Sequence, residues 1–428
     1  MSFAVNVFAP IALRLLKVGP FQAKEVVLRF DDDKKTDPSP TNLYLIAGMN
    51  GLGKTTILES IVACLGLLEG DLRGSPPQAP EWLTDHPDAR LQLDVLVELV
   101  EQSEKRRGVL SLVLCEEPQQ TTPGLYYWTG SELTRWGASF NARLTVHSPS
   151  GLRVWEEVAF NTGGDLDDHA VELVRGLRDH IQRAKRKPIG DHLMAPREDA
   201  PSVLMFTSHR DLAPRVPSSK RSITQPPEWS HSLVRRFDSE VGWLSSLDAL
   251  LVYLDYIDGR RSPEQGEPRF NQARALLNEH LFIDEEGLPT KTLLRVDREQ
   301  MATVIEVKTP NPDGGPPVTT THGLDRLSSG EKAFAQILVR LATHMTKNTL
   351  VLIDEADLHL HPSWERSMMA SLKRLVRRQP GLRCFVATHS NDMITIFDVH
   401  RDEGSLTKDG FIVNDETFTG RDGEDDDE

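Results

Sequence analysis

The feature that most restricts this chain is a glycine-rich turn at residues 48–56, GMNGLGKTT, set between two regular segments. Before it lies Leu43–Ala47, a continuous apolar run of the kind found in buried parallel strands. After it, apolar residues recur with helical spacing over residues 57–68. A GxxxxGKT sequence between a strand and a helix predicts a loop whose backbone N–H groups surround a phosphate.

The residue types in this loop suit the phosphates of ATP bound together with Mg²⁺. Glycines let the backbone approach the phosphate oxygens, and the following helix directs the positive end of its dipole at them. The ammonium of Lys54 is expected between the β- and γ-phosphates, and the hydroxyl of Thr55 is expected to ligate Mg²⁺. The nucleotide-binding residues predicted in the loop are Gly48, Asn50, Gly51, Gly53, Lys54, Thr55 and Thr56.

Two apolar runs in the last third of the chain also read as strands that end in polar residues: one runs into Asp354 and Glu355, the other into His389. Because parallel sheets bind ligands at the carboxyl ends of their strands, Asp354 is predicted to hold Mg²⁺ together with Thr55. Alternation along the strand is expected to turn Glu355 toward the γ-phosphate, as the base for the attacking water. His389 is expected to hydrogen-bond the γ-phosphate, which makes Glu355 and His389 the predicted catalytic residues.

A third segment, residues 327–332 with the sequence LSSGEK, opens a predicted helix that runs to about residue 345. Ser328 and Glu331 have the spacing of a capping box, in which each satisfies a backbone N–H of the other. A helix that starts with Ser and Gly is also an anion site. Local sequence leaves both roles open.

The phosphate loop, the LSSGEK segment, the Asp354–Glu355 strand end and His389 together resemble the ABC ATPase superfamily, over about residues 1–70 and 320–395. The resemblance implies an α/β fold, an ABC ATPase head with a mostly parallel core sheet, an antiparallel β lobe and an inserted helical lid. It also implies a homodimer or higher oligomer, in which ATP on one subunit's loop is contacted by Ser328, Ser329 and Gly330 of the other.

Within this superfamily, residues 354–362 (DEADLHLHP) resemble the DExELHLHP signature of the RecF/OLD-like branch, which places His359 and His361 in a loop that touches the partner subunit. A His-x-His metal pair is the alternative. The resemblance implies the regulatory ATPase of a bacterial anti-phage complex, similar to Septu- or PARIS-type systems, with a separate nuclease or toxin as effector. A RecF-like DNA-repair ATPase and an ATP-locked scaffold are the other candidates.

Five segments are expected along the chain. They are the head's N-terminal part (1–90), the β lobe with a helix (91–200), a basic segment with the helical insertion (201–285), the head's C-terminal part (286–412) and an acidic disordered tail (413–428). Helix is expected over residues 165–187 and 229–281, and a core strand at residues 202–206. Missing heptads argue against a long coiled-coil arm. No glutamine ends a core strand as in ABC heads, and Arg210 is the candidate replacement.

Composition adds expectations about location and partners. Three separated cysteines and the absence of a long apolar run or leader favour a cytoplasmic protein without a membrane segment. The net charge of −15 disfavours a protein covered in nucleic acid, but residues 175–236 carry 13 Lys and Arg against 6 Asp and Glu. Nucleic-acid binding through this stretch is therefore a possible, secondary activity.

Overall fold

The computed structural model describes residues 4–22, 26–30, 42–69, 89–101, 104–115, 124–128, 152–153, 176–177, 179–182, 200–209, 216–225, 232–240, 242–260, 268–283, 288–309, 311, 316–358 and 360–399. Several expectations lie outside these residues: most of the helix over 165–187, Arg210, His359 and the acidic tail 413–428. No helix within the described part of the chain is long and apolar enough to cross a membrane.

Five parallel strands form the core sheet, in the order β3-β14-β13-β8-β9. They are β3 (Leu43–Ala47), β14 (Leu382–Thr388), β13 (Thr349–Ile353), β8 (Ser202–Phe206) and β9 (Val234–Phe237). The expected parallel core is therefore confirmed. One strand was overlooked: β9 lies where only helix was expected, because its sequence VRRF pairs on one side only and lacks the apolar run of a central strand.

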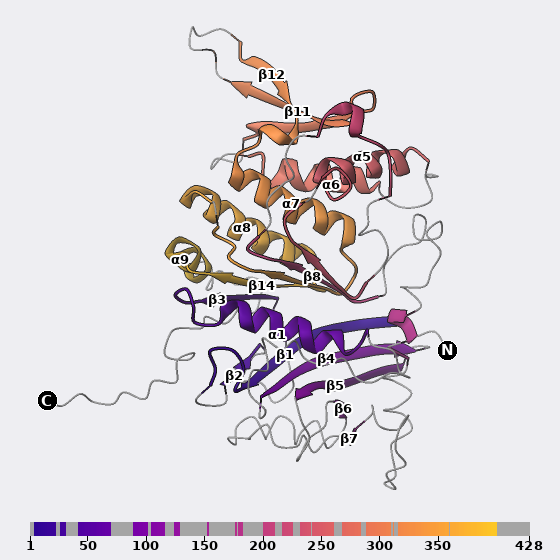
Figure 1. Ribbon diagram of the computed structural model, residues 1–428, viewed down its shortest axis with the longest axis vertical. Coiled ribbons are helices and arrows are strands. Elements are labelled where there is room, and N and C mark those ends of the chain that lie inside the picture. The colour runs from indigo at the N-terminus through magenta and orange to yellow at the C-terminus, as the bar shows by residue number, and fades with distance from the viewer. Residues whose placement is uncertain are drawn as a thin grey trace, which may run out of the picture.

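Alternate side chains of the core strands point to opposite faces and enter two separate cores. Tyr44, Met205, Leu352 and Phe385 pack with α1 (Lys54–Gly66) on one face. On the other face, the strands pack with α5 (Leu247–Asp258), α6 (Arg269–His280), α7 (Ser329–His344), α8 (Pro362–Arg378) and α9 (Asn391–Val399). Figure 1 shows α1 on one side of the core sheet and α5 to α9 on the other.

A second sheet, antiparallel throughout, covers the outer side of α1 (Figure 1). Its order is β2-β1-β4-β5-β6-β7, with β1 (Ala4–Leu16), β2 (Val26–Arg29), β4 (Arg90–Glu101), β5 (Glu104–Cys115), β6 (Gly124–Trp128) and β7 (Leu152–Arg153). The expected antiparallel lobe is present, and it holds the phosphate-loop helix between two sheets.

The helical insertion is also present, as α5 and α6. Four leucines of α5, Leu247, Leu250, Leu251 and Leu254, are buried. These helices pack against a third sheet, made of β10 (Lys291–Asp297), β11 (Ala302–Thr309) and β12 (Val318–His322) in that order. The chain passes from β12 through a short 3₁₀ turn, Leu324–Arg326, directly into α7.

Charged side chains tie β9 and the turn after it to helices on both faces of the core sheet. Arg236 makes two hydrogen bonds to the carboxylate of Glu59 on α1. On the other face, Arg340 of α7 lies 3.3 Å from Glu240, and both side chains are almost fully buried. Arg340 also donates to the carbonyl of Ser245 and lies over the Phe237 ring at 4.5 Å.

This buried ion pair predicts a large loss of stability when one partner is removed. Arg340→Ala leaves Glu240 charged and buried, so the free energy of unfolding should fall by about 3–5 kcal/mol. Urea denaturation measures the change. The matched control, Glu240→Gln with Arg340→Met, removes both charges and should recover much of the loss; equal losses in the two variants would contradict the assignment.

Candidate nucleotide-binding site

The glycine loop has the backbone that its sequence predicts. Gly51 and Gly53 adopt φ values of 85° and 97°, in the region that favours glycine. A Cβ on Gly53 would also lie 2.6 Å from Cζ of Phe21 and 2.7 Å from Cγ of Pro20. Glycine at position 53 is therefore required both by its conformation and by the close approach of the Gly19–Pro20 turn.

Helix α1 begins at Lys54, immediately after Gly53. The ammonium of Lys54 donates to the carbonyls of Gly48 and Met49 at 2.7 and 2.8 Å, and the residue is only 6% exposed. Because these carbonyls belong to the loop itself, the cation is held across the mouth of the turn. The loop thus presents a fixed positive charge and the N-terminus of a helix to one point.

The structure brings together the two residues predicted to share a metal ion. The hydroxyl of Thr55 lies 3.1 and 3.0 Å from the two carboxylate oxygens of Asp354, across 299 residues of sequence. Asp354 is 3% exposed, and its backbone N–H donates to the carbonyl of Phe206 on β8 at 2.9 Å. A hydroxyl and a carboxylate beside a helix N-terminus fit Mg²⁺, which prefers oxygen ligands.

Glu355 lies one residue further on, but strand alternation does not set its direction. β13 ends at Ile353, and Glu355 has a φ of 45°, a left-handed conformation that is uncommon for a residue with a side chain. The N–H of Ala356 then donates to the carbonyl of Ala387 at 3.0 Å, which fixes the turn against β14. A tight turn, and not strand alternation, therefore sets the direction of Glu355 relative to Asp354. Strained backbone conformations of this kind are common at functional sites.

His389 follows β14 and is held by a carboxylate that the sequence analysis did not assign. Its Nδ1 lies 2.7 Å from Asp357, whose other oxygen accepts from the Thr388 hydroxyl at 2.6 Å. The Asp357 side chain is 4% exposed, whereas that of His389 is 46% exposed. Contact through Nδ1 leaves Nε2 as the ring atom that faces away from Asp357. Asp357 lies within the DEADLHLHP segment, and this position was the sequence signal that could have identified it as a site residue.

The LSSGEK segment forms the predicted capping box at the start of α7. The backbone N–H of Ser328 donates to Glu331 at 2.9 Å, and the N–H of Glu331 donates to the Ser328 hydroxyl at 3.3 Å. Ser328 and Ser329 are exposed, whereas Gly330 is buried. Because α7 and α1 cover opposite faces of the core sheet, the start of α7 does not join the glycine loop in one chain's site.

Other sequence candidates have structural roles in this chain. His361 caps α8, since its Nδ1 accepts from the N–H of Ser363 at 3.4 Å. The described residues, which do not include His359, contain no group of three or more His, Cys, Asp or Glu side chains that could hold a metal ion. In the basic stretch, Arg236 binds Glu59 and Arg221 donates to the carbonyl of Val216 at 2.8 Å. Gln182, a glutamine of the middle region, donates to the carbonyl of Glu69.

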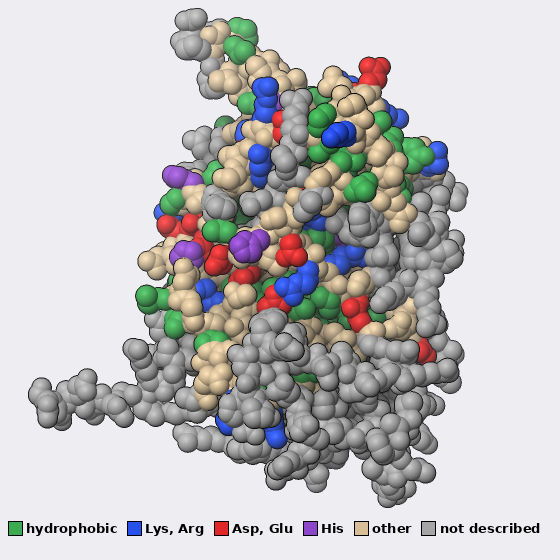
Figure 2. All heavy atoms as spheres, viewed as in Figure 1, with side chains coloured by type: hydrophobic (Ala, Val, Ile, Leu, Met, Phe, Trp, Pro, Cys, Tyr) green, Lys and Arg blue, Asp and Glu red, His purple; other side chains and the backbone are tan. Residues whose placement is uncertain are grey.

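The carboxyl edge of the core sheet carries one further polar pair, which sequence reasoning missed with β9. The Thr207 hydroxyl, after β8, donates to Asp238, after β9, at 2.8 Å. These residues occupy the strand ends next to Asp354. Figure 2 shows acidic and histidine side chains gathered at the level of the core sheet and of α8 and α9.

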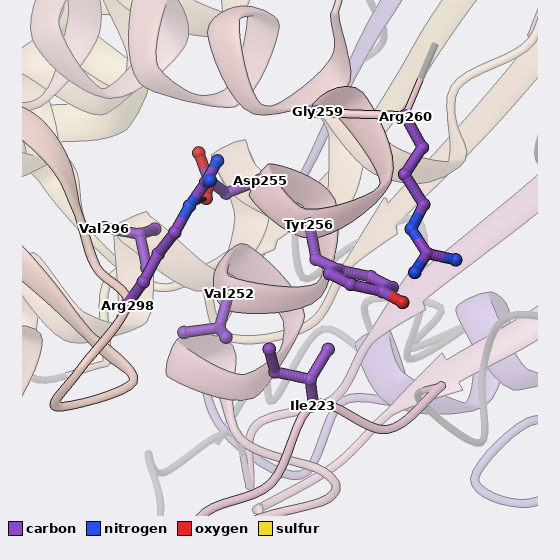
Figure 3. Close-up of a pocket in the computed structure, with 8 residues that line it drawn as sticks. All are labelled: Ile223, Val252, Asp255, Tyr256, Gly259, Arg260, Val296 and Arg298. Atoms are coloured by element: carbon purple, nitrogen blue, oxygen red, sulfur yellow. Dashed lines mark hydrogen bonds and ion pairs between the residues drawn. The ribbon is translucent and has the colours of Figure 1, made fainter.

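A separate pocket of about 210 Å³ lies on α5 and β10. Figure 3 shows the residues that line it, with Val252 and Ile223 facing the cavity. Arg298 pairs with Asp255 at 2.8 Å, and Arg260 lies over the Tyr256 ring at 4.3 Å. Pockets for nucleotide-sized ligands are usually larger, at about 300–1,000 Å³. This pocket contains none of the residues predicted to bind ATP.

The glycine loop, its helix and the Thr55–Asp354 contact at the end of a parallel strand have the arrangement of a P-loop ATPase. A family model described as "AAA domain, putative AbiEii toxin, Type IV TA system" matches residues 197–394, from β8 to α9. The site and this match together support a P-loop ATPase of the AAA- or ABC-like class.

Individual relatives match less of the chain or with lower similarity. The "Retron Ec83 probable ATPase" of Escherichia coli is 31% identical over 84 residues, a segment covering 17% of this chain and 15% of that protein. The SMC head domain from Thermotoga maritima is similar at a TM-score of 0.38 and 13% identity, covering 91% of this chain and 92% of the other. The dimeric ATP-binding cassette MJ0796, in a post-hydrolysis state with ADP and Pi, has a TM-score of 0.29 and 12% identity, covering 89% of each chain.

Proposed function

We propose that this protein hydrolyses ATP in a site completed by a second copy, and that the ATP state of the pair controls a separate effector in a bacterial defence complex. The observation that carries the ATPase proposal is the contact between Thr55 of the glycine loop and Asp354 of β13. Two distant segments meet there with the oxygen ligands that Mg²⁺ needs. When bound, Mg²⁺ neutralises charge on the β- and γ-phosphates.

Each residue of the site then has one task. The loop N–H groups and Lys54 bind the phosphates, and Glu355 orients and polarises the attacking water. Asp357 fixes the imidazole of His389, so that its Nε2 is presented to the γ-phosphate. Thr207 and Asp238, at the same sheet edge, are candidates for the position where ABC heads place a glutamine.

The need for a second copy is supported by the layers of the fold. Ser328 and Ser329 are exposed at a helix N-terminus, where backbone N–H groups favour an anion, yet α7 is separated from α1 by the core sheet. The start of α7 is thus available to ATP bound on another copy. The capping box does not exclude this role, because it uses the N–H groups of Ser328 and Glu331 and not those of Ser329 and Gly330.

The proposed role in defence is supported by the descriptions of the family model and of the relative that match this chain. The description of the family model names the AbiEii toxin and a type IV TA system, and the curated relative is described as the ATPase of a retron. The two descriptions name a type IV TA system and a retron. A separate nuclease or toxin is therefore the proposed effector. In the basic stretch, Arg221 and Arg236 make hydrogen bonds within the chain.

A mixing experiment tests the two-copy site. Ser328→Arg blocks the start of α7 and Lys54→Ala disables the loop, so each variant alone should be inactive in a phosphate-release assay. In a mixed pair, the intact loop of the Ser328→Arg chain faces the intact α7 start of the Lys54→Ala chain. Each mixed pair has one whole site of two, and random pairing makes about half of the pairs mixed, so mixing should restore up to about a quarter of wild-type activity.

Two outcomes would contradict the proposal. Ser328→Arg with wild-type turnover would leave Ser328 as a cap alone, whose loss costs only about 1 kcal/mol of stability. A mixture that stays inactive, although mixed pairs are found by mass, would show that the start of α7 does not serve the partner's nucleotide. Melting curves of each variant are the control for folding.

A further inference from the structure

β11 and β12 form a ribbon that projects from the body of the molecule (Figure 1). β10 pairs with β11 only as far as Val307, so beyond that residue β11 and β12 have only each other. Residues 308–309 and 318–321 are exposed, and Val318 retains 50% of its surface. An isolated two-stranded ribbon is only marginally stable in water, so one with open sides is a candidate for a further strand.

The outer edge of β12 is open to such a strand. Among the described residues, β12 has a ladder on one side only, toward β11, and no register shift interrupts that ladder. Solvent-exposed edges usually carry Lys, Pro or a bulge that prevents pairing. Residues 318–322 are Val-Thr-Thr-Thr-His, which contain none of these, and Pro316 and Pro317 limit pairing only on the N-terminal side.

The sequence of β12 is complementary to itself in the antiparallel direction. With Thr320 on the two-fold axis, Thr319 of one copy faces Thr321 of the other, and Val318 faces His322. When His322 is neutral, none of these paired side chains is charged, so the pairing contains no like-charge contact. All of the paired residues except His322 are β-branched, which suits strand geometry. On β11, the residues paired with Thr319 and Thr321 are Lys308 and Glu306, whose opposite charges lie 3.5 Å apart.

We propose that β12 is a self-association edge, which pairs antiparallel with β12 of a second copy to join two three-stranded sheets into one of six strands. A five-residue ladder buries well below the roughly 1,200 Å² of a stable interface, so this contact should be weak alone and matter mainly between chains already held at high local concentration. The contact is independent of the ATP-dependent pairing proposed above. Two different two-fold contacts on one chain would generate a closed dihedral assembly or an open array.

The position of β12 connects this edge to the nucleotide chemistry. Its last residue, His322, is followed by the Leu324–Arg326 turn and then by Ser328 at the start of α7. The His322 ring is anchored to the carbonyl of Gly323 at 2.8 Å. A strand added to β12 would therefore lie within a few residues of the helix start that is proposed to contact ATP.

Cysteine cross-linking tests the proposed register. In Thr320→Cys, the two new thiols face each other across the axis at a Cα separation of about 4.5–5.5 Å, which a disulfide can bridge. The matched control is Thr319→Cys. Position 319 faces Thr321 of the partner subunit, and the Cα atoms of the two 319 positions are about 8 Å apart, beyond disulfide range. Under mild oxidation, Thr320→Cys should form linked dimers about ten-fold faster than Thr319→Cys.

The natural cysteines provide the background for this comparison. Burial raises the pKa of the Cys64 thiol and raises that of Cys384 to about 12, so neither is a reactive thiolate. The wild-type chain, treated in parallel, controls for every natural cysteine. Equal cross-linking of the two variants, or linkage in neither at high protein concentration, would overturn the proposal and favour an edge for a different protein.

Light scattering separates this contact from the ATP-dependent one. In the Glu355→Gln background with ATP, the average mass should exceed that of a dimer, and adding Thr320→Pro should return it to a dimer, because proline lacks an N–H and is poorly tolerated within a paired strand. An unchanged mass in the proline variant would overturn the β12 contact. If ATP produces no dimer but Thr320→Cys still cross-links, the proposed nucleotide pairing fails while the β12 contact stands.

Discussion

Glu355→Gln should lower the turnover of ATP by about 10²–10⁴-fold while leaving ATP binding nearly unchanged, since this is the usual contribution of a general base. The amide keeps the size and hydrogen-bonding capacity of the side chain but cannot accept a proton from water. The φ of 45° at position 355 is a backbone conformation that an amide of the same size can also adopt, so the fold around Asp354 should persist. Single-turnover hydrolysis and calorimetric ATP binding measure the two effects separately.

The same variant should accumulate the ATP-bound state, in which two copies associate. Size-exclusion chromatography with ATP should show more dimer than for the wild-type chain. A matched control is Asp357→Asn, which keeps Glu355 but weakens the support of His389. Wild-type turnover in Glu355→Gln would mean that another group activates the water.

Lys54→Ala should weaken ATP binding by about 100-fold, because it removes a charged donor to the phosphates worth about 3 kcal/mol. The side chain is held over the loop by the carbonyls of Gly48 and Met49, so its position is set before the nucleotide arrives. Calorimetry on the wild-type and variant chains, with Mg²⁺ present, gives the two dissociation constants. Unchanged affinity would contradict the assignment of residues 48–56 as the phosphate site.

Thr55→Ala provides the matched control for this measurement. Its hydroxyl contacts Asp354 and not the loop carbonyls, so its loss should reduce the benefit of Mg²⁺ and leave metal-free binding little changed. Comparing both variants with and without Mg²⁺ separates the phosphate contact from the metal contact. A Thr55→Ala variant that keeps the full effect of Mg²⁺ would remove Thr55 from the predicted metal site.

Local chemistry explains why much of the site could be predicted. A glycine loop must have φ values that only glycine adopts easily, and it must lie between a strand and a helix. Both requirements can be checked in the local sequence. The capping box at Ser328 and Glu331 is likewise a four-residue property. Leu43–Ala47 and Ser202–Phe206 were recognised because strands covered on both faces are continuously apolar.

Edges and turns were harder, since local periodicity does not describe them. β9 is an edge strand whose Arg236 reaches Glu59 on α1, so its charge pattern reflects a contact with another element. The direction of Glu355 was expected from alternation, but β13 ends two residues earlier and a positive φ takes over. Asp357 had no assigned role until His389 was placed beside it.

By itself, the sequence determined a glycine loop between a strand and a helix, the strand ends that carry carboxylates, and a helix start with a capping box, because each depends on neighbouring residues. Only the tertiary structure decided which of these meet. The parallel register of β3, β14, β13 and β8 brings Asp354 to Thr55. The core sheet, which is buried on both faces, separates α1 from α7. That register depends on packing between segments as far apart in the sequence as β3 and β14, which local sequence patterns do not describe.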